Sequence, residues 1–305
     1  MSTQYKQPAP LFGVSLTPAA DETEKLLHLS QVADAAGLDV LAIQDHPYNP
    51  EFLDTWTLLS LIGGRTKQIR LTADVSPIAL RPPAMLAKAA ASLDILTGGR
   101  LEMGVGTGAY WEAIESFGGP RRKPGEAVAA LREGIDIMRL LWQDRAGREV
   151  NYSGQYYNLK GAQAGPAPRH NINIWVGAVG PKMLQLICEL ADGWFAPLAV
   201  YVTPEKAAAS NKIIDAAAVA AGRDPGSVRR IYNVPGVVLA SEQGSVRGNR
   251  PGVTVGTPQR WVETLLSYYR EVGMDSFVFW PSGGDAEQQV RLFAEEVAPA
   301  VRAQL

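Results

Sequence analysis

The chain has 305 residues, of which 46% are hydrophobic and 20% are charged, a composition that fits one large α/β domain or two modest ones. Its 29 Lys and Arg residues nearly balance 31 Asp and Glu residues, so the net charge of −2 argues against nucleic acid or an anionic membrane as a partner. Its single cysteine excludes an internal disulfide, and its three histidines form no metal-binding motif.

No segment reaches the roughly 20 uninterrupted apolar residues that a membrane-spanning helix needs. The first residues also lack the long apolar core of a signal peptide. We therefore expect a cytoplasmic protein that acts on a small-molecule substrate.

Eight short apolar segments run through the sequence, and most of them are uninterrupted rather than alternating. Uninterrupted segments of this length are typical of parallel strands that are covered on both faces. They lie at residues 11–16, 40–44, 69–75, 101–105, 172–176, 193–196, 231–239 and 276–280. The segments between them have helical periodicity and helix-start signals such as Thr203-Pro204 and Thr257-Pro258.

The alternation of strands and helices predicts a single (β/α)8 barrel, a TIM barrel, over residues 1–305, with a doubly wound sheet as the alternative. A much longer segment separates the fourth and fifth strands than separates the first four. We therefore predict an insertion at approximately residues 107–171, with a hairpin at 149–159 around Ser153-Gly154. The strand ends and this insertion are expected to form the substrate cavity.

In a barrel of this kind the active site lies at the carboxyl ends of the strands, so the residues after each strand are the candidates. The second strand is followed by Asp45 and His46, which suit proton transfer or hydrogen bonding to a polar ring system. The alternative is a loop cap and a structural histidine. The third strand ends in the polar pair Asp74 and Ser76, which indicates either a bulge with a ligand contact or an ordinary loop entry.

Closely spaced glycines follow the next two strands. Gly104, Gly106 and Gly108 would let backbone approach a ligand. Their spacing also resembles the motifs of adenosylmethionine-dependent methyltransferases and, in part, of dinucleotide-binding proteins, but those motifs belong to the first strand of an open sheet. After the fifth strand, Gly177 and Gly180 precede a proline, which fits a phosphate site at a helix N-terminus or a plain tight turn.

Taken together, these strand ends resemble the luciferase-like oxidoreductase family, flavin and deazaflavin enzymes built on a (β/α)8 barrel. Within that family they are most similar to the branch that uses coenzyme F420. The motifs that carry the resemblance, in chain order, are Asp45-His46, Pro83-Ala84, Leu93-Asp94, Gly98-Gly99-Arg100, Gly104-Val105-Gly106-Thr107-Gly108, Ala178-Val179-Gly180-Pro181, Ala191-Asp192-Gly193 and Gly256-Thr257-Pro258.

The resemblance implies that His46 is catalytic, moving a proton or supporting hydride transfer. The residues that it implies for cofactor binding are Asp45, Ala73, Asp74, Ser76, Thr107, Gly108, Glu112, Ala178, Val179, Gly180, Lys182 and Met183. The bulge of the family commonly has a non-proline cis peptide behind the ring, and here it would fall at Ala73-Asp74. The resemblance also implies a homodimer formed through helices of the amino-terminal half.

The chain departs from the sugar-phosphate dehydrogenases of this branch at Ala109, where they have a glutamate that acts as an acid or base. Glu112 or Glu115 are candidates to replace it. We therefore predict an F420-dependent oxidoreductase that transfers a hydride between the deazaflavin and an unidentified small organic substrate. The alternatives are an FMN-dependent monooxygenase of the same family, a non-catalytic flavin-binding protein, which Ala109 keeps open, and, most distantly, a methyltransferase.

Overall fold

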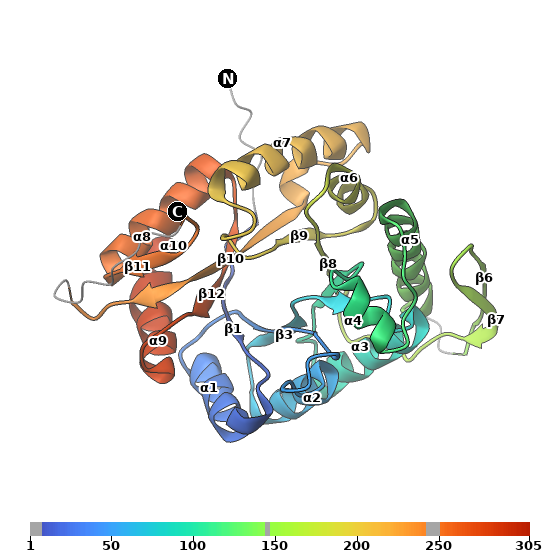
Figure 1. Ribbon diagram of the computed structural model, residues 1–305, viewed down its shortest axis with the longest axis horizontal. Helices are drawn as coiled ribbons and strands as arrows, with labels where there is room; N and C mark the ends of the chain where they lie inside the picture. The colour runs from blue at the N-terminus through green and yellow to red at the C-terminus, as the bar shows by residue number, and fades with distance from the viewer. Residues whose placement is uncertain (1–7, 144–146, 242–250) are drawn as a thin grey trace.

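A ring of parallel strands surrounded by helices forms the body of the protein (Figure 1). The computed structural model describes residues 8–143, 147–241 and 251–305. Each of the eight predicted segments overlaps one strand of the ring, which confirms the barrel and rejects the doubly wound sheet. The strands are β1 (Phe12–Leu16), β2 (Val40–Ile43), β3 (Arg70–Ala73), β5 (Met103–Gly106), β8 (Ile174–Gly177), β9 (Gly193–Ala196), β10 (Arg229–Val238) and β12 (Ser276–Pro281).

The barrel closes between β3 and β5, where a single parallel bridge joins Leu71 to Leu101. Beyond β3 the chain leaves the ladder for two residues, and β4 (Ser76–Pro77) then pairs with β5. A further short strand, β11 (Thr254–Gly256), pairs with β10 outside the ring. The third strand is therefore interrupted at the point where the sequence predicted a bulge.

Helices follow the strands and cover the outside of the barrel (Figure 1). Proline occupies the first turn of six of them, where a backbone N–H has no partner within the helix in any case. The α-helices are α1 (Thr23–Ala35), α2 (Thr55–Arg65), α3 (Pro83–Thr97), α4 (Trp111–Ser116), α5 (Pro124–Leu141), α6 (Pro181–Leu190), α7 (Pro204–Ala220), α8 (Pro258–Ser267), α9 (Ala286–Leu292) and α10 (Ala298–Arg302). Short 3-10 turns lie at Ala20–Glu22 and Pro225–Ser227, and π-helical turns lie at Tyr268–Val272 and Phe293–Val297. No described helix is long and apolar enough to cross a bilayer.

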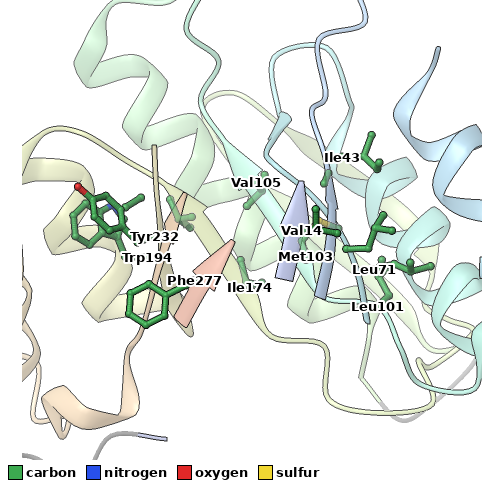
Figure 2. Close-up of a cluster of buried hydrophobic side chains, with 14 of the residues drawn as sticks. Val14, Ile43, Leu71, Leu101, Met103, Val105, Ile174, Trp194, Tyr232 and Phe277 are labelled. Carbon is green, nitrogen blue, oxygen red and sulfur yellow. The ribbon is translucent and has the colours of Figure 1, made fainter. Parts of the chain in front are cut away.

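Side chains alternate along the strands between two apolar layers. One layer fills the barrel and consists of Val40, Ala42, Trp175, Phe195, Ile231 and Val278. The other layer packs against the helices, and Figure 2 labels ten of its members, among them Val14, Ile43 and Phe277. Because the interior is filled, any ligand site must lie above it, at an end of the barrel.

The segment between β5 and β8 contains α4, α5 and an antiparallel hairpin of β6 (Glu149–Ser153) and β7 (Asn158–Gln163). The hairpin lies on the outer side of α5, away from the ring of strands (Figure 1). Its turn is held by Glu133, whose carboxylate accepts hydrogen bonds from the backbone N–H groups of Gln155, Tyr156 and Tyr157. The hairpin is present where the sequence predicted it, with a second strand that extends further.

Candidate active site

A cavity of about 450 Å³ lies at the carboxyl ends of the strands, above the apolar layer that fills the barrel. Residues within or after seven of the eight barrel strands contribute to its wall. They are Gln44, Asp45, His46, Tyr48, Asp74, Val75, Pro77, Gly106, Thr107, Gly108, Ala109, Tyr110, Gly177, Ala178, Val179, Met183, Phe195, Pro197, Leu198, Tyr201, Asn233 and Trp280. The predicted insertion contributes to the wall through its first residues, 107–110, whereas its hairpin is packed on α5.

Eight of the predicted site residues line this cavity: Asp45, His46, Asp74, Thr107, Gly108, Ala178, Val179 and Met183. Ala73, Ser76, Gly180 and Lys182 adjoin it in the chain without lining it. Glu112 lies elsewhere: its side chain is 80% exposed and pairs with Arg121 at 2.8 Å. Glu115 pairs with the same arginine, and neither glutamate lines the cavity.

The carboxylate of Asp45, at the end of β2, is buried and fully engaged within the protein. Arg81 donates to it twice, from Nε to Oδ2 at 2.6 Å and from Nη2 to Oδ1 at 2.7 Å. Ser76 donates to Oδ2 at 2.6 Å and itself accepts from the indole N–H of Trp56 at 2.9 Å. Asp45 thus fixes the loop after β4 by charge and hydrogen bonds, and Ser76 acts on the site through it.

His46 lies in the cavity wall beside two tyrosines. Its Nδ1 is 2.8 Å from the hydroxyl of Tyr48, and the rings of Tyr48 and Tyr110 lie 5.5 and 5.8 Å from its own. Burial lowers the pKa of His46, against an opposing effect of Asp45, and burial also raises the pKa of Tyr48 to about 12. At neutral pH the histidine is therefore uncharged and the tyrosine keeps its proton.

Asp74 lies at the interruption of the third strand, where the structure has a cis peptide between Asp74 and Val75. The sequence placed this feature one residue earlier, at Ala73-Asp74. Ala73 is instead a regular, buried member of β3 that pairs with Ile43. Burial raises the pKa of Asp74 to about 7, although a hydrogen bond from the side chain of Asn233 favours the ionised form.

The glycines at the ends of β5 and β8 are needed for packing around this interruption. A Cβ added at Gly106 or Gly177 would lie 2.9 or 2.7 Å from Cγ2 of Val75, and one at Gly104 would lie 1.8 Å from the carbonyl oxygen of Ala73. The glycine spacing therefore reflects how closely neighbouring strands approach the bulge. The methyltransferase and dinucleotide interpretations are not needed to explain it.

The start of α6 has the features of an anion site. Gly180 is the residue before the helix, and nothing lies within 4 Å of the position that its Cβ would take. Pro181 opens the helix, and the exposed Lys182 follows it. Backbone N–H groups and the helix dipole at such an end attract a phosphate, and Lys182 adds a positive charge.

The sequence did not single out several of the wall residues: Tyr48, Tyr110, Phe195, Tyr201 and Asn233. Asn233 and Trp280 come from neighbouring strands, since Asn233 is in register with Val278, two residues before Trp280. Within the described chain, Oδ1 of the buried Asn233 and the indole N–H of Trp280 have no hydrogen-bond partner. Unpartnered buried polar atoms in a cavity wall are available to a polar ligand. Position after a strand end was the signal that could have found Tyr48, Tyr110 and Tyr201, whereas Asn233 lies within β10 and had no such signal.

A filled eight-stranded barrel with its cavity at the carboxyl ends of the strands defines the class of TIM-barrel proteins with a site at this face. Residues 9–248 match the sequence profile of the luciferase-like monooxygenase family. The match covers most of the chain, so this protein belongs to that family, as its motifs predicted.

Known proteins resemble the chain along much or nearly all of its length. The F420-dependent glucose-6-phosphate dehydrogenase of Gordonia bronchialis is 26% identical over 324 residues, covering 92% of this chain and 94% of the relative. The 5,10-methylenetetrahydromethanopterin reductase of Archaeoglobus fulgidus is 33% identical over 182 residues, covering 60% of this chain and 51% of the relative. A solved structure, the coenzyme F420-dependent tetrahydromethanopterin reductase of Methanopyrus kandleri, has a TM-score of 0.84 at 21% identity, covering 96% of this chain and 99% of that one. The last likeness concerns the fold.

Proposed function

We propose that the protein is an F420-dependent oxidoreductase that transfers a hydride between the deazaflavin and a small organic substrate. The observation that carries the proposal is family membership, together with a curated F420-dependent relative that aligns over 94% of its length. The cavity at the barrel mouth gives such a cofactor a place to bind. The reaction class follows from the cofactor, which accepts or donates a hydride when bound.

The residues of the cavity fit a flat ring joined to a phosphate. Val75, Ala178 and Met183 offer an apolar wall, and the unpartnered polar atoms of Asn233 and Trp280 offer hydrogen bonds to a polar ring edge. The open start of α6 and Lys182 suit the phosphate. We propose these groups as the cofactor site.

His46 is the proposed catalytic residue. It is neutral at neutral pH because burial lowers its pKa, so it is able to take a proton from the substrate as the hydride leaves. The hydroxyl of Tyr48 fixes the ring by its 2.8 Å hydrogen bond, and Tyr110 covers one side of it. His46→Asn is expected to lower kcat/KM by about 100-fold or more. The matched control is His28→Asn, on an exposed histidine that pairs with Glu287, which should leave activity unchanged.

A cofactor titration tests the proposal. The intrinsic fluorescence of F420 should change on binding, with much tighter affinity than for FMN. Lys182→Ala should weaken binding, because it removes a charge at the phosphate site, whereas Lys212→Ala on the exposed side of α7 should not. Tight binding of FMN without affinity for F420 would overturn the choice of cofactor.

We also propose a homodimer formed through α2 and α3. These helices present Leu61, Met85 and Leu96, which are 45%, 66% and 80% exposed. Large exposed apolar side chains on neighbouring helices commonly mark a protein interface. Light scattering should give twice the monomer mass, and Met85→Glu with Leu96→Glu should halve it.

The cytoplasm remains the proposed location, since a single buried cysteine needs no oxidising compartment.

A further inference from the structure

Asp74 is set apart from the other acidic groups of the cavity by its surroundings. Two carboxyl groups line the described part of the cavity, Asp45 and Asp74. Asp45 is neutralised by Arg81 at 2.6 Å, whereas Asp74 forms no ion pair with any described residue. The cavity therefore contains one carboxyl group that is committed to structure and one that is not.

The partner of Asp74 reaches it from the opposite side of the barrel. The side chain of Asn233 on β10 is 2% exposed and lies close enough to the carboxyl group of Asp74 to lower its pKa against the effect of burial. Its Nδ2 donates to the carbonyl oxygen of Ala196 at 3.1 Å. Below this pair lies the apolar filling of the barrel, which includes Trp175 and Phe195. Asp74 and Asn233 together form a polar floor on an apolar base.

The groups that face Asp74 do not favour its charge. The titratable side chains of the described wall are Asp45, His46, Tyr48, Tyr110 and Tyr201, and no lysine or arginine is among the described wall residues. His46 and Tyr48 are both uncharged at neutral pH. A carboxylate on an apolar base without a cation is unfavourable, so Asp74 tends to keep its proton.

Hydride transfer adds negative charge to the bound cofactor, and Asp74 is placed to offset that charge. A hydride carries an electron pair into the cofactor ring and adds one negative charge, which is costly in a site of low dielectric unless a donor or a proton offsets it. Arg81 is engaged with Asp45, Ala109 carries no proton, and Glu112 and Glu115 are paired with Arg121. Asp74 is the remaining carboxylic acid in the described wall.

We propose that Asp74 is a second catalytic residue, the acid that offsets the charge which hydride transfer adds to the bound cofactor. The inference rests on the proposed function. In the oxidative direction a substrate C–H bond breaks with its electron pair going to the deazaflavin, and the proton of the adjacent O–H or N–H bond goes to His46. Asp74 would then give the proton of its O–H bond to the reduced ring. After product release His46 would lose its proton to water and Asp74 would take one from water, so both groups return to their starting states. The substrate loses two electrons, and the cofactor gains them.

Binding of the two redox states of the cofactor tests this role without turnover. Dissociation constants for oxidised and reduced F420 are measured by titration on the wild type, Asp74→Asn and Asp74→Ala, with Asp136→Asn on α5 as the control for a half-buried carboxyl outside the cavity. Asp74→Ala should weaken binding of the reduced form about tenfold and leave the oxidised form within about threefold. Asp136→Asn should change neither.

The pH dependence separates the acid from a merely structural residue. The wild type should lose its preference for the reduced form as pH rises through about 7, because the group that donates becomes a carboxylate. Asp74→Asn should show a preference that does not change with pH, since its amide donates at every pH, but its turnover should fall because it has no proton to give. Equal preference in all variants, or a wild-type preference that does not change with pH, would overturn the role of Asp74 while leaving F420 binding intact. Absence of F420 binding in the wild type would overturn the proposed function and this inference together.

Discussion

Two aspartates follow neighbouring strands of the barrel and border the same cavity, yet their surroundings differ in every respect. Asp45, after β2, receives three hydrogen bonds from Arg81 and Ser76. Asp74, after β3, has only the amide of Asn233 and an apolar base. Arg81 and Ser76 compensate the charge of Asp45, whereas burial without a cation raises the pKa of Asp74 to about 7.

The difference shows that one face of a barrel can carry both a carboxyl group that holds loops in place and a carboxyl group that is free to react. The Asp45 network joins the ends of β2, β4 and α2, because Arg81 also pairs with Asp54, the N-cap of α2. The interruption of the third strand has no such network, and the side chain of Asp74 there lines the cavity. A buried charge with partners holds loops in place, and one without partners is available for reaction.

The largest expected effect comes from removing the cation of the first site. Arg81→Met leaves the carboxylate of Asp45 buried with Ser76 as its remaining donor, which should lower the free energy of unfolding by about 3–5 kcal/mol. Urea denaturation measures it. Arg121→Met, which breaks only an exposed pair, should cost less than about 1 kcal/mol. Similar losses in the two variants would mean that Asp45 is not compensated as described.

The second site should respond to pH in the opposite sense to an ordinary aspartate. The folded protein keeps the proton of Asp74 up to about pH 7, whereas the unfolded chain loses it near 3.8, so stability falls as pH rises between these values. Asp74→Asn removes this loss. Its free energy of unfolding should exceed that of the wild type by roughly 2–4 kcal/mol at pH values above 7.

Urea denaturation of the wild type and Asp74→Asn across this pH range measures the effect. The advantage of the variant should shrink towards zero as pH falls to about 4. A constant difference across the range would contradict the raised pKa of Asp74.

A smaller effect is expected at the histidine next to Asp45. Tyr48→Phe removes the hydroxyl that bonds Nδ1 of His46 and should lower kcat/KM about three- to tenfold, close to 1 kcal/mol. Tyr110→Phe keeps its ring against His46 and removes no hydrogen bond to it, so it should change kcat/KM less than about twofold. Steady-state kinetics on both variants checks the pair, and equal losses would assign Tyr48 a packing role alone.

The smallest effect is expected for Glu112→Gln. Its side chain is exposed and pairs with Arg121 on the surface of α4, so the free energy of unfolding should change by less than about 0.5 kcal/mol. Activity should stay within about twofold. A large loss of activity would restore Glu112 as a member of the site and weaken the case for Asp74 as its acid.

The barrel was predictable from the sequence because uninterrupted apolar segments at regular spacing are a strong signal for parallel strands. Each predicted segment overlaps a barrel strand, with ends that differ by no more than two residues. The two strands that were missed, β4 and β11, are two and three residues long, too short to show any periodicity. The cis peptide was predicted one residue early because the local sequence does not specify which peptide bond of a bulge adopts the cis form.

The site was predictable only where it follows strand ends. That position pointed to Asp45, His46 and Asp74, whereas the ion pair of Asp45 depends on Arg81, which is 36 residues away. Asn233 was missed because it lies within a long apolar strand whose pattern says nothing about the opposite wall. Contacts across a barrel interior are set by the radius and register of the whole ring, which no single segment encodes.

The interruption of the third strand also bears on how members of such a fold diverge. Closure of the barrel depends on the bridge between Leu71 and Leu101 below position 74 and on β4 above it, and the backbone N–H of Asp74 donates to Ile43 whatever its side chain. The residue at position 74 can therefore change while the ladder around it stays the same. We expect natural variation at this one position to alter the proton chemistry of the cavity without refolding the barrel, which makes it an economical route from one reaction to another.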